Sequence, residues 1–298
     1  MYTKSIMKLE YKVEKDCKYT NIKQILKEEF YISDRLIIKL KKENHIYLNN
    51  NTISLYNQFK PGDILTIDLN FEEESENIIP TKMNLDILYE DNALLIVNKP
   101  SGTPVHPSMM HFENSLSNGV KYYFKQKNIK RKIRPVNRLD KNTSGIVTFA
   151  KNQYIQECLS KQMQLGLFNK EYIAILEGNL GNDSGTINAP IARKENSIIE
   201  REVSEKGATS ITHYKLIKNY DNYCLVNFIL ETGRTHQIRV HSKYIGHPIL
   251  GDTLYGNSSN LINRQALHAY KIEFIHPINN KKLQIIAALP DDIKKLIL

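Results

Sequence analysis

The chain has 298 residues, of which 41% are hydrophobic and 24% charged, so an intrinsically disordered chain is excluded. No apolar run approaches the roughly 20 residues needed to cross a bilayer, which excludes a membrane-spanning protein. The formal net charge is +9, and residues 81–298 alone carry +10. A positive field of this kind favours a polyanionic partner, either nucleic acid or an acidic membrane surface.

Cysteine content and the N-terminus restrict the compartment. The three cysteines are an odd number, lie far apart and form no C-x-x-C pair, so neither a disulfide framework nor a cysteine zinc site is predicted. Met1–Glu10 interleaves lysines with single apolar residues and lacks the apolar core of a secretory signal. We therefore expect a cytoplasmic protein.

The first 71 residues predict a small α+β module. Apolar residues recur there at helical spacing in two stretches, and Ser33 is placed to cap the second helix. A Pro61-Gly62-Asp63 turn precedes an alternating apolar segment that predicts a strand. The predicted helices cover 22–30 and 34–40, and the predicted strands cover 46–48 and 64–69.

Residues 72–80 are predicted to be an acidic linker. Four glutamates fall between residues 72 and 76 with no basic residue, and Pro80 disfavours a helix. A run of like charges repels itself and breaks the apolar pattern on either side. The chain is therefore divided into an N-terminal module over 1–71, this linker, and a larger domain over 81–298.

Strands dominate the larger domain. Apolar strand-like runs occur at 85–89, 93–97, 145–150, 172–176, 211–217, 223–230 and 283–288, and helical stripes occur at 116–124 and 155–163. Because the strands do not alternate strictly with helices, we predict an α+β fold with a mixed, largely antiparallel sheet.

The densest polar cluster is Arg138–Gly145, directly before a predicted buried strand. Asp140 lies there between a nearby arginine and a lysine, and hydroxyl residues follow it. These neighbours would keep the carboxylate ionised and ready to act as nucleophile or base. A capped turn without catalytic function is the alternative, since such clusters are common in turns.

A second polar cluster, Thr232–His241, is rich in hydrogen-bond donors. Arg234 and Arg239 lie five residues apart, with His236 and a glutamine between them. Guanidinium groups present a rigid fork that suits phosphate or carboxylate recognition. The alternative is a solvated basic turn.

Tyr172, in Lys170-Glu171-Tyr172 at the start of a predicted strand, is a third candidate. Near an exposed sheet edge its ring could stack on a base, although packing is the commoner role of such a tyrosine. The three histidines 236, 241 and 247 do not match a zinc template. No phosphate loop, dinucleotide fingerprint or nucleophile elbow occurs, so ATPase, dehydrogenase and α/β-hydrolase functions are not predicted.

Taken together, the motifs from about residue 83 to 290 resemble the RluA-type family of pseudouridine synthases. Any one motif is weak, but their order along the chain is specific. The ordered set is 87–91, Val97-Asn98-Lys99-Pro100-Ser101-Gly102, 105–107, Arg138-Leu139-Asp140, 143–145, 150–151, Lys170-Glu171-Tyr172, 233–241, 246–248, Gly251-Asp252, 254–256, 267–269 and 276–277. Asn137 stands where the family often has histidine.

The N-terminal module is similar to an S4 RNA-binding domain. The resemblance rests on Ser33-Asp34-Arg35-Leu36, the helix that follows, Ile46-Tyr47-Leu48 and Pro61-Gly62-Asp63 in matching order. Asn44-His45-Ile46 replaces the glycine and valine usual before the family's short strand. The S4 resemblance is therefore less specific than the resemblance of the larger domain.

The larger resemblance implies isomerisation of uridine within RNA, with no cofactor and no metal. It makes Asp140 the catalytic residue, as nucleophile or base. Arg239 matches the arginine that pairs with this carboxylate, and Tyr172 matches the tyrosine that packs on the target base. Because a base in folded RNA must leave its stack, Arg138 is a candidate for contacting RNA around the vacated position.

Further RNA-binding candidates are Arg35 in the N-terminal module and Arg234 and His236 in the second cluster. Ribosomal RNA is the expected partner and transfer RNA is an alternative, while no membrane partner and a monomeric state are expected. Two other classes remain open: an RNA-binding or ribosome assembly protein that has lost catalysis, and a glycosidase. A glycosidase normally needs paired carboxylates, and the first cluster supplies only Asp140.

Overall fold

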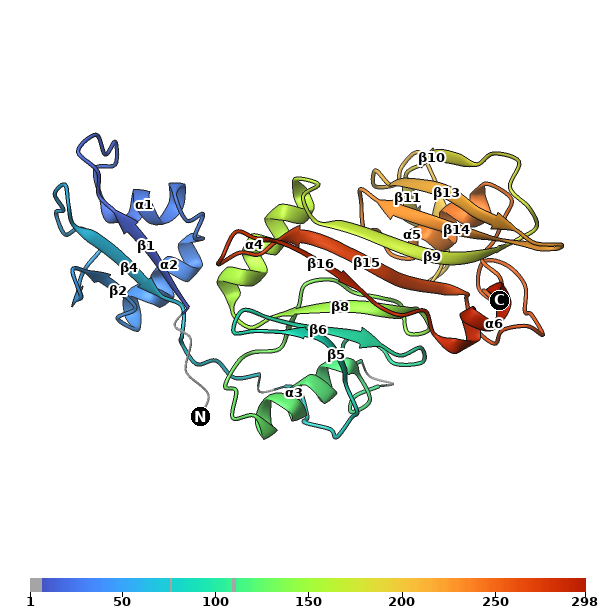
Figure 1. The fold of residues 1–298 in the computed structure, drawn as a ribbon, viewed down its shortest axis with the longest axis horizontal. Helices are drawn as coiled ribbons and strands as arrows, with labels where there is room; N and C mark the ends of the chain where they lie inside the picture. Colours follow the sequence, from blue (N-terminus) through green and yellow to red (C-terminus); the bar gives the residue numbers. More distant parts are fainter. Residues whose placement is uncertain (1–6, 76, 109–110) are drawn as a thin grey trace.

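The computed structural model of the protein describes residues 7–75, 77–108 and 111–298 (Figure 1). Part of the N-terminal stretch considered for a secretory signal, and Glu76 of the predicted linker, lie outside these residues. Within the described residues, no helix is long and apolar enough to span a bilayer.

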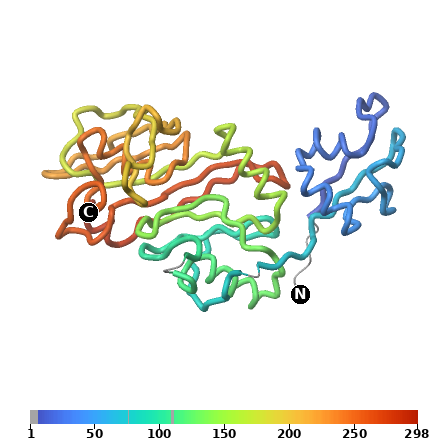
Figure 2. The backbone as a smooth tube through the Cα atoms, turned by 180° about the vertical axis from the view of Figure 1, so that it is seen from behind, coloured from blue at the N-terminus to red at the C-terminus, as the bar shows by residue number. Residues whose placement is uncertain are grey.

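The N-terminal module packs two helices against a four-stranded antiparallel sheet of order β1-β4-β2-β3. The hydroxyl of Ser33 accepts a hydrogen bond from the Leu36 amide, which confirms the predicted helix cap. The module lies at one end of the molecule in both views (Figures 1 and 2). Its elements are β1 (Lys8–Lys12), α1 (Ile22–Glu28), α2 (Asp34–Lys42), β2 (Ile46–Leu48), β3 (Asn51–Thr52) and β4 (Ile64–Asp68).

Ion pairs hold the acidic segment between the two parts of the chain. Glu73 Oε1 lies 2.7 Å from Lys39 Nζ of α2 and 3.0 Å from Arg134 Nη2 of the larger domain. Ser75 accepts a hydrogen bond from the Ile133 amide. These cations offset the repulsion expected among the glutamates, and Glu73 thereby links the module to the larger domain.

The larger domain is built on one sheet of order β10-β13-β14-β9-β15-β8-β6-β5, with β16 beside β15 and β7 beside β8. Among the described strands, β15 and β8 run parallel and the other pairs are antiparallel, so the predicted fold class is confirmed. The strands are β5 (Asp86–Glu90), β6 (Leu94–Lys99), β7 (Arg134–Pro135), β8 (Ser144–Ala150), β9 (Asn169–Glu177), β10 (Ser184–Asn188), β13 (Ile211–Asn219), β14 (Tyr223–Leu230), β15 (Leu267–Ile275) and β16 (Lys282–Ile286).

Helices and a short hairpin complete the domain (Figure 1). Helix α3 shares an apolar cluster with β6 and β8, and α4 belongs to a second cluster that also includes the core of the N-terminal module. The remaining elements are α3 (Leu116–Gln126), α4 (Gln153–Gln164), β11 (Ile191–Arg193), β12 (Arg201–Val203), α5 (Gln237–Tyr244) and α6 (Asp291–Ile297).

The apolar pattern did not predict several elements of the larger domain, which are β7, β10, β11, β12, α5, β15 and α6. The Thr232–His241 cluster, expected as a basic turn in one interpretation, contains the start of helix α5. Among its buried positions, Gln237, Arg239 and His241 alternate with Ile238 and Val240, so the helix shows no apolar stripe at helical spacing. Strand β15, which lies in the middle of the sheet, was also not predicted.

Candidate active site

Asp140 lies on the loop that joins β7 to β8, and side chains from elsewhere in the domain hold this loop in place. The ammonium of Lys99, which is fully buried, donates to the Lys141 carbonyl at 2.9 Å. Arg264 Nη1 donates to the Asn142 carbonyl at 3.2 Å. Burial lowers the pKa of Lys99 to about 7, against the opposing effect of the Asp140 charge. The backbone on the C-terminal side of Asp140 is therefore held by two basic side chains.

Gly145 allows the strand after this loop to lie close to its parallel neighbour. Its φ is +113°, and a Cβ atom there would lie 2.3 Å from the Ala269 carbonyl oxygen of β15. Only glycine fits this backbone without displacing β15 or the loop.

Arg239 joins two carboxylates. Its Nη1 lies 3.0 Å from Asp140 Oδ2, while its Nε and Nη2 make a bidentate pair with Asp252 at 2.7 and 2.8 Å. The side chain of Asp252 is 1% exposed, whereas that of Asp140 is 27% exposed. Asp252 therefore orients the guanidinium, and Asp140 keeps an accessible face.

The surroundings of Arg239 shape the electrostatics of the site. Burial lowers the pKa of Arg239, but its hydrogen bonds and charge attraction to Asp252, and then to Asp140, outweigh burial and raise it. Burial lowers the pKa of His236 more than the Asp140 charge raises it, so the neutral ring is favoured. His236 Nε2 lies 3.7 Å from Asp140 Oδ1, beyond ordinary hydrogen-bond distance. A fixed cation and a neutral imidazole thus face the carboxylate.

These groups line a cavity of about 790 Å³ at one face of the sheet. Six of the seven residues predicted for the site line this cavity, and Arg35 does not. Arg35 is exposed on α2 of the N-terminal module. The six are Arg138, Asp140, Tyr172, Arg234, His236 and Arg239.

Tyr172 lies on β9, in the interior of the sheet between β14 and β15, so the expectation that it lies near an exposed edge is wrong. Its side chain is buried and lines the cavity. Burial, and then the negative charge of Asp140, raise the pKa of the phenol, so the hydroxyl stays protonated at neutral pH. The ring is an apolar wall close to the carboxylate.

Arg138 and Asn137 differ in how firmly they are held. Arg138 is exposed at the cavity, and its side chain has no hydrogen-bond or ion-pair partner among the described residues. Asn137 donates to the Ile146 carbonyl and accepts from the Thr148 amide, so both polar atoms of its side chain hold β8. The residue that departs from the family pattern has a structural role here.

Three other residues support the site without having been assigned a role from the sequence. In the sequence, Lys99 and Asp252 stand out only as members of the ordered motifs. The patterns that could have pointed to them are Asn98-Lys99-Pro100 and Gly251-Asp252. The hydroxyl of Tyr255 lies 2.8 Å from His236 Nδ1, and its ring centroid lies 5.0 Å from the Arg239 guanidinium carbon. These residues were missed because their contacts join distant parts of the chain.

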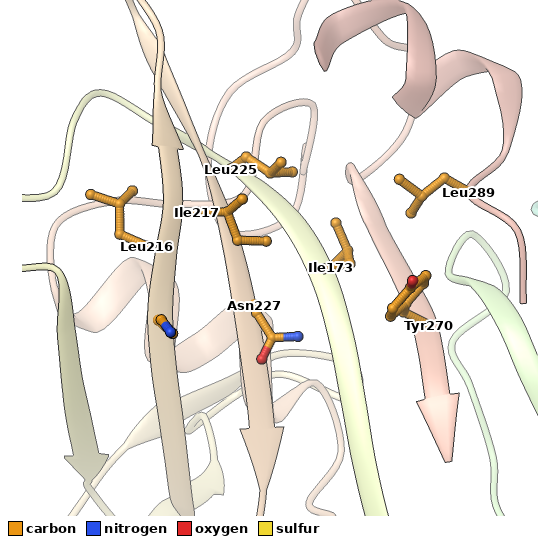
Figure 3. Close-up of a pocket in the computed structure, with 8 residues that line it drawn as sticks. Ile173, Leu216, Ile217, Leu225, Asn227, Tyr270 and Leu289 are labelled. Carbon is orange, nitrogen blue, oxygen red and sulfur yellow. The ribbon is translucent and has the colours of Figure 1, made fainter. Parts of the chain in front are cut away.

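The other face of the same strands carries a separate, mostly apolar hollow of about 540 Å³ (Figure 3). Ile173, next to Tyr172 on β9, faces this hollow, since successive side chains of a strand point to opposite faces. Tyr270 of β15 and Leu289 also line it. The hollow contains none of the residues predicted for the site.

The three histidines considered for a metal are placed differently. His241 contacts the Thr212 hydroxyl and the Ala189 carbonyl through its two ring nitrogens, and His247 contacts the Glu177 carbonyl. Within the described residues, no group of three histidine, cysteine or acidic side chains is arranged to hold a metal ion.

The comparisons with known proteins agree with this site. Residues 93–244 match the family model described as RNA pseudouridylate synthase. The chain is 42% identical over 257 residues to a Bacillus subtilis protein named uncharacterized RNA pseudouridine synthase YhcT, covering 86% of this chain and 83% of the relative. It is 38% identical to ribosomal large subunit pseudouridine synthase D of Zymomonas mobilis, over 80% of each chain.

A solved structure shows the same fold. The structure titled human RNA pseudouridylate synthase domain containing 1 aligns with a TM-score of 0.57 and 25% identity, over 69% of this chain and 83% of that one. The chain belongs to the RNA pseudouridylate synthase family, and the RluA-type resemblance is confirmed. It is an isomerase that acts on RNA and forms pseudouridine.

Proposed function

We propose that this synthase uses Asp140 to isomerise specific uridines of ribosomal RNA. The observation that carries the proposal is the contact of Asp140 with Arg239, whose orientation is set by Asp252. A partly exposed carboxylate held by a buried cation has a fixed orientation and keeps a face open to the substrate, as a nucleophile or base requires.

In the proposed reaction the bond between N1 of uracil and C1′ of ribose breaks, the uracil turns, and C5 bonds to C1′. The hydrogen on C5 leaves as a proton, and N1 gains one, so the RNA keeps its mass. Asp140 acts either at C1′ as nucleophile or on a ribose proton as base. Tyr172 packs on the turning uracil, and its buried ring limits the directions in which the base can rotate.

Reaching Asp140 requires the target nucleotide to leave its stack, at a cost of a few kcal/mol. Arg138, exposed and unpaired among the described residues, is our candidate for contacting the RNA around the vacated position. We expect Arg138→Ala to reduce the reaction rate on folded RNA more than on a short single-stranded substrate. Equal losses on both substrates would contradict a role tied to base flipping.

The decisive experiment is tritium release from RNA that carries 5-tritiated uridine. We expect the protein to release tritium and its Asp140→Asn variant to lose at least about a thousandfold in rate, because the variant lacks the ionised carboxylate. Product analysis separates other outcomes: free base would indicate a glycosidase, and unchanged RNA would favour an RNA-binding or assembly protein. Absence of release on any RNA, including RNA from cells lacking the protein, would contradict the proposal.

The choice of ribosomal RNA rests on the relatives. Several of them are named ribosomal large subunit pseudouridine synthase D, at 32 to 38% identity. Transfer RNA is the alternative substrate. Tritium release should be compared on ribosomal and transfer RNA transcripts, and a response of transfer RNA alone would overturn this choice.

We further propose that the protein acts as a cytoplasmic monomer. Asp140 has the cation that holds it and the ring beside it within one copy, so the proposed reaction requires no group from a second copy. Light scattering of the active protein should give the mass of one chain, and fractionation of cells should recover it with the soluble contents.

A further inference from the structure

We propose that Lys170 and Arg234 form a phosphate-binding subsite at the rim of the catalytic cavity, which holds a backbone phosphate of the RNA beside the target uridine. The inference rests on the proposed function, because it assumes that the target uridine reaches Asp140. It assigns a task to Lys170, a cavity residue that has no role in the reaction described above.

Lys170 lies on β9 and lines the catalytic cavity, which places the subsite next to Tyr172. Lys170 precedes Tyr172 by two residues, so their side chains leave the same face of the strand about 7 Å apart. Both side chains line the catalytic cavity. Between them, Glu171 faces the other side, where it pairs with Lys271 at 2.8 Å. A base packed on Tyr172 would bring its own backbone toward Lys170.

Lys170 is a half-buried cation that lacks a partner. Among the described residues its ammonium makes no hydrogen bond or ion pair, and burial lowers its pKa. The other two lysines whose pKa is lowered by burial are both paired: Lys99 donates to three carbonyls, and Lys151 pairs with Glu90 at 2.7 Å. A partly desolvated cation without a partner is unfavourable, and an anion at this point would relieve the cost.

Gly233 and Arg234 form the other side of the subsite. A Cβ atom on Gly233 would lie 3.4 Å from Lys170 Nζ, so the ammonium sits directly over this glycine. Arg234 is exposed, and its Nε donates to the Thr209 carbonyl at 3.0 Å. Its two terminal nitrogens have no partner among the described residues. Two cations therefore flank a residue without a side chain, which leaves room for an incoming group.

The chemistry of the cavity favours phosphate as the anion. The carboxylates that line the cavity are committed, since Asp140 contacts Arg239 and Glu231 contacts His213 at 2.6 Å. The substrate is RNA, which carries a phosphate at every nucleotide. A lysine ammonium binds phosphate as a point charge, and an arginine can add a forked contact. The subsite would thus position the target nucleotide by its backbone and leave the base free to turn.

The test measures binding of a fluorescein-labelled decauridylate over a range of about 50 to 200 mM salt. We expect Lys170→Met to weaken binding about tenfold at low salt, because one charge-assisted contact is lost. The slope of log affinity against log salt should become shallower by about 0.7, the contribution of one phosphate contact to a single strand. Lys170→Arg should restore most of both.

Lys215→Met is the matched control. Lys215 is exposed on β13 and lines the hollow on the opposite face, so this variant loses the same charge without touching the cavity. We expect it to leave both affinity and slope nearly unchanged. If Lys170→Met and Lys215→Met give the same affinities and slopes, only the overall field matters and the subsite is overturned. Thermal melting of each variant verifies folding.

Tritium release separates failure of the subsite from failure of the proposed function. With an RNA on which the wild type reacts, Lys170→Met should raise KM about tenfold and change kcat much less, because the phosphate contact lies away from the reacting atoms. An unchanged KM and an unchanged salt slope in Lys170→Met, with an active wild type, would reject the subsite alone. An inactive wild type would reject the proposed function.

Discussion

Strands β9, β14 and β15 have two different faces, each built by alternate residues of the same strands. One face carries the catalytic cavity, where Asp140 is partly exposed and Lys170 and Arg138 have no partner among the described residues. The other face carries the apolar hollow, and beside it Glu171 and Lys271 neutralise each other. Cationic side chains are therefore left unpaired on the cavity face, whereas the two charges beside the hollow form an ion pair.

The difference in charge pairing identifies the functional face better than cavity volume does. The two hollows are of similar size, about 790 and 540 Å³, so volume alone does not separate them. The cavity differs in having a carboxylate oriented by a buried cation, with free cations at its rim. A partly buried charge without a partner is unfavourable in a folded protein, and a charged substrate can supply the missing partner.

The largest effect is expected from breaking the ion pair between Arg239, which lines the cavity, and Asp252. Arg239→Met leaves Asp252 buried without a cation, and we expect a loss of about 3–5 kcal/mol in the free energy of unfolding. Adding Asp252→Leu should recover much of this stability but no activity, since Asp140 still lacks its cation. Urea unfolding and tritium release measure the two effects. Recovery of activity in the double variant would contradict the role given to Arg239.

A pH titration tests the buried His268, which contacts Ser144 at the end of the catalytic loop. His268 of β15 is fully buried and contacts the Ser144 hydroxyl at 2.9 Å, and burial lowers its pKa to about 4. In the unfolded chain this pKa is about 6.5, so between pH 6.5 and 4 the unfolded state binds a proton that the folded state does not. The folded state should therefore lose up to about 3 kcal/mol of stability as the pH falls through this range.

His268→Gln is the comparison for this titration. Its free energy of unfolding, measured by urea at a series of pH values, should depend less on pH between 6.5 and 4 than that of the wild type. Parallel curves for the two proteins would show that His268 does not titrate as its burial implies.

Two tyrosines on neighbouring strands give a matched test of the faces. Tyr172→Leu removes the ring that faces the cavity, and we expect the reaction to slow by roughly tenfold to a hundredfold, since a stacked base contributes about 1–3 kcal/mol. Tyr270→Leu removes a ring that faces the hollow and should leave tritium release unchanged. A similar loss of activity in both variants would remove the distinction between the faces.

The smallest effect is expected for the paired charges beside the hollow. Glu171 and Lys271 are each about a quarter exposed, at 25% and 24%, and such pairs contribute at most about 1 kcal/mol. Glu171→Gln should change the free energy of unfolding by less than this amount and leave kcat and KM as they are. A tenfold fall in kcat would show that the opposite face takes part in the reaction.

Local sequence patterns predicted much of the fold, and helix α5 shows one reason why they fail elsewhere. Strand β8 was recognisable because all seven of its residues are buried, and Gly145–Ala150 is mostly apolar and has no charged residue. Helix α5 was not, because its inward positions hold Gln237, Arg239 and His241, whose hydrogen-bond partners lie elsewhere in the chain. Apolar periodicity reports burial against a core and fails where burial is polar.

By itself the sequence determined the class of fold, the family and the set of residues from which the site is built, because apolar periods and ordered motifs are local properties of the chain. The tertiary structure decided how these residues meet. Asp140 and Arg239 are 99 residues apart in sequence and 3.0 Å apart in space, and the partner that orients Arg239 is Asp252. Which charges are paired and which are left free depends on distances between strands and loops, and such distances exist only once the sheet has formed.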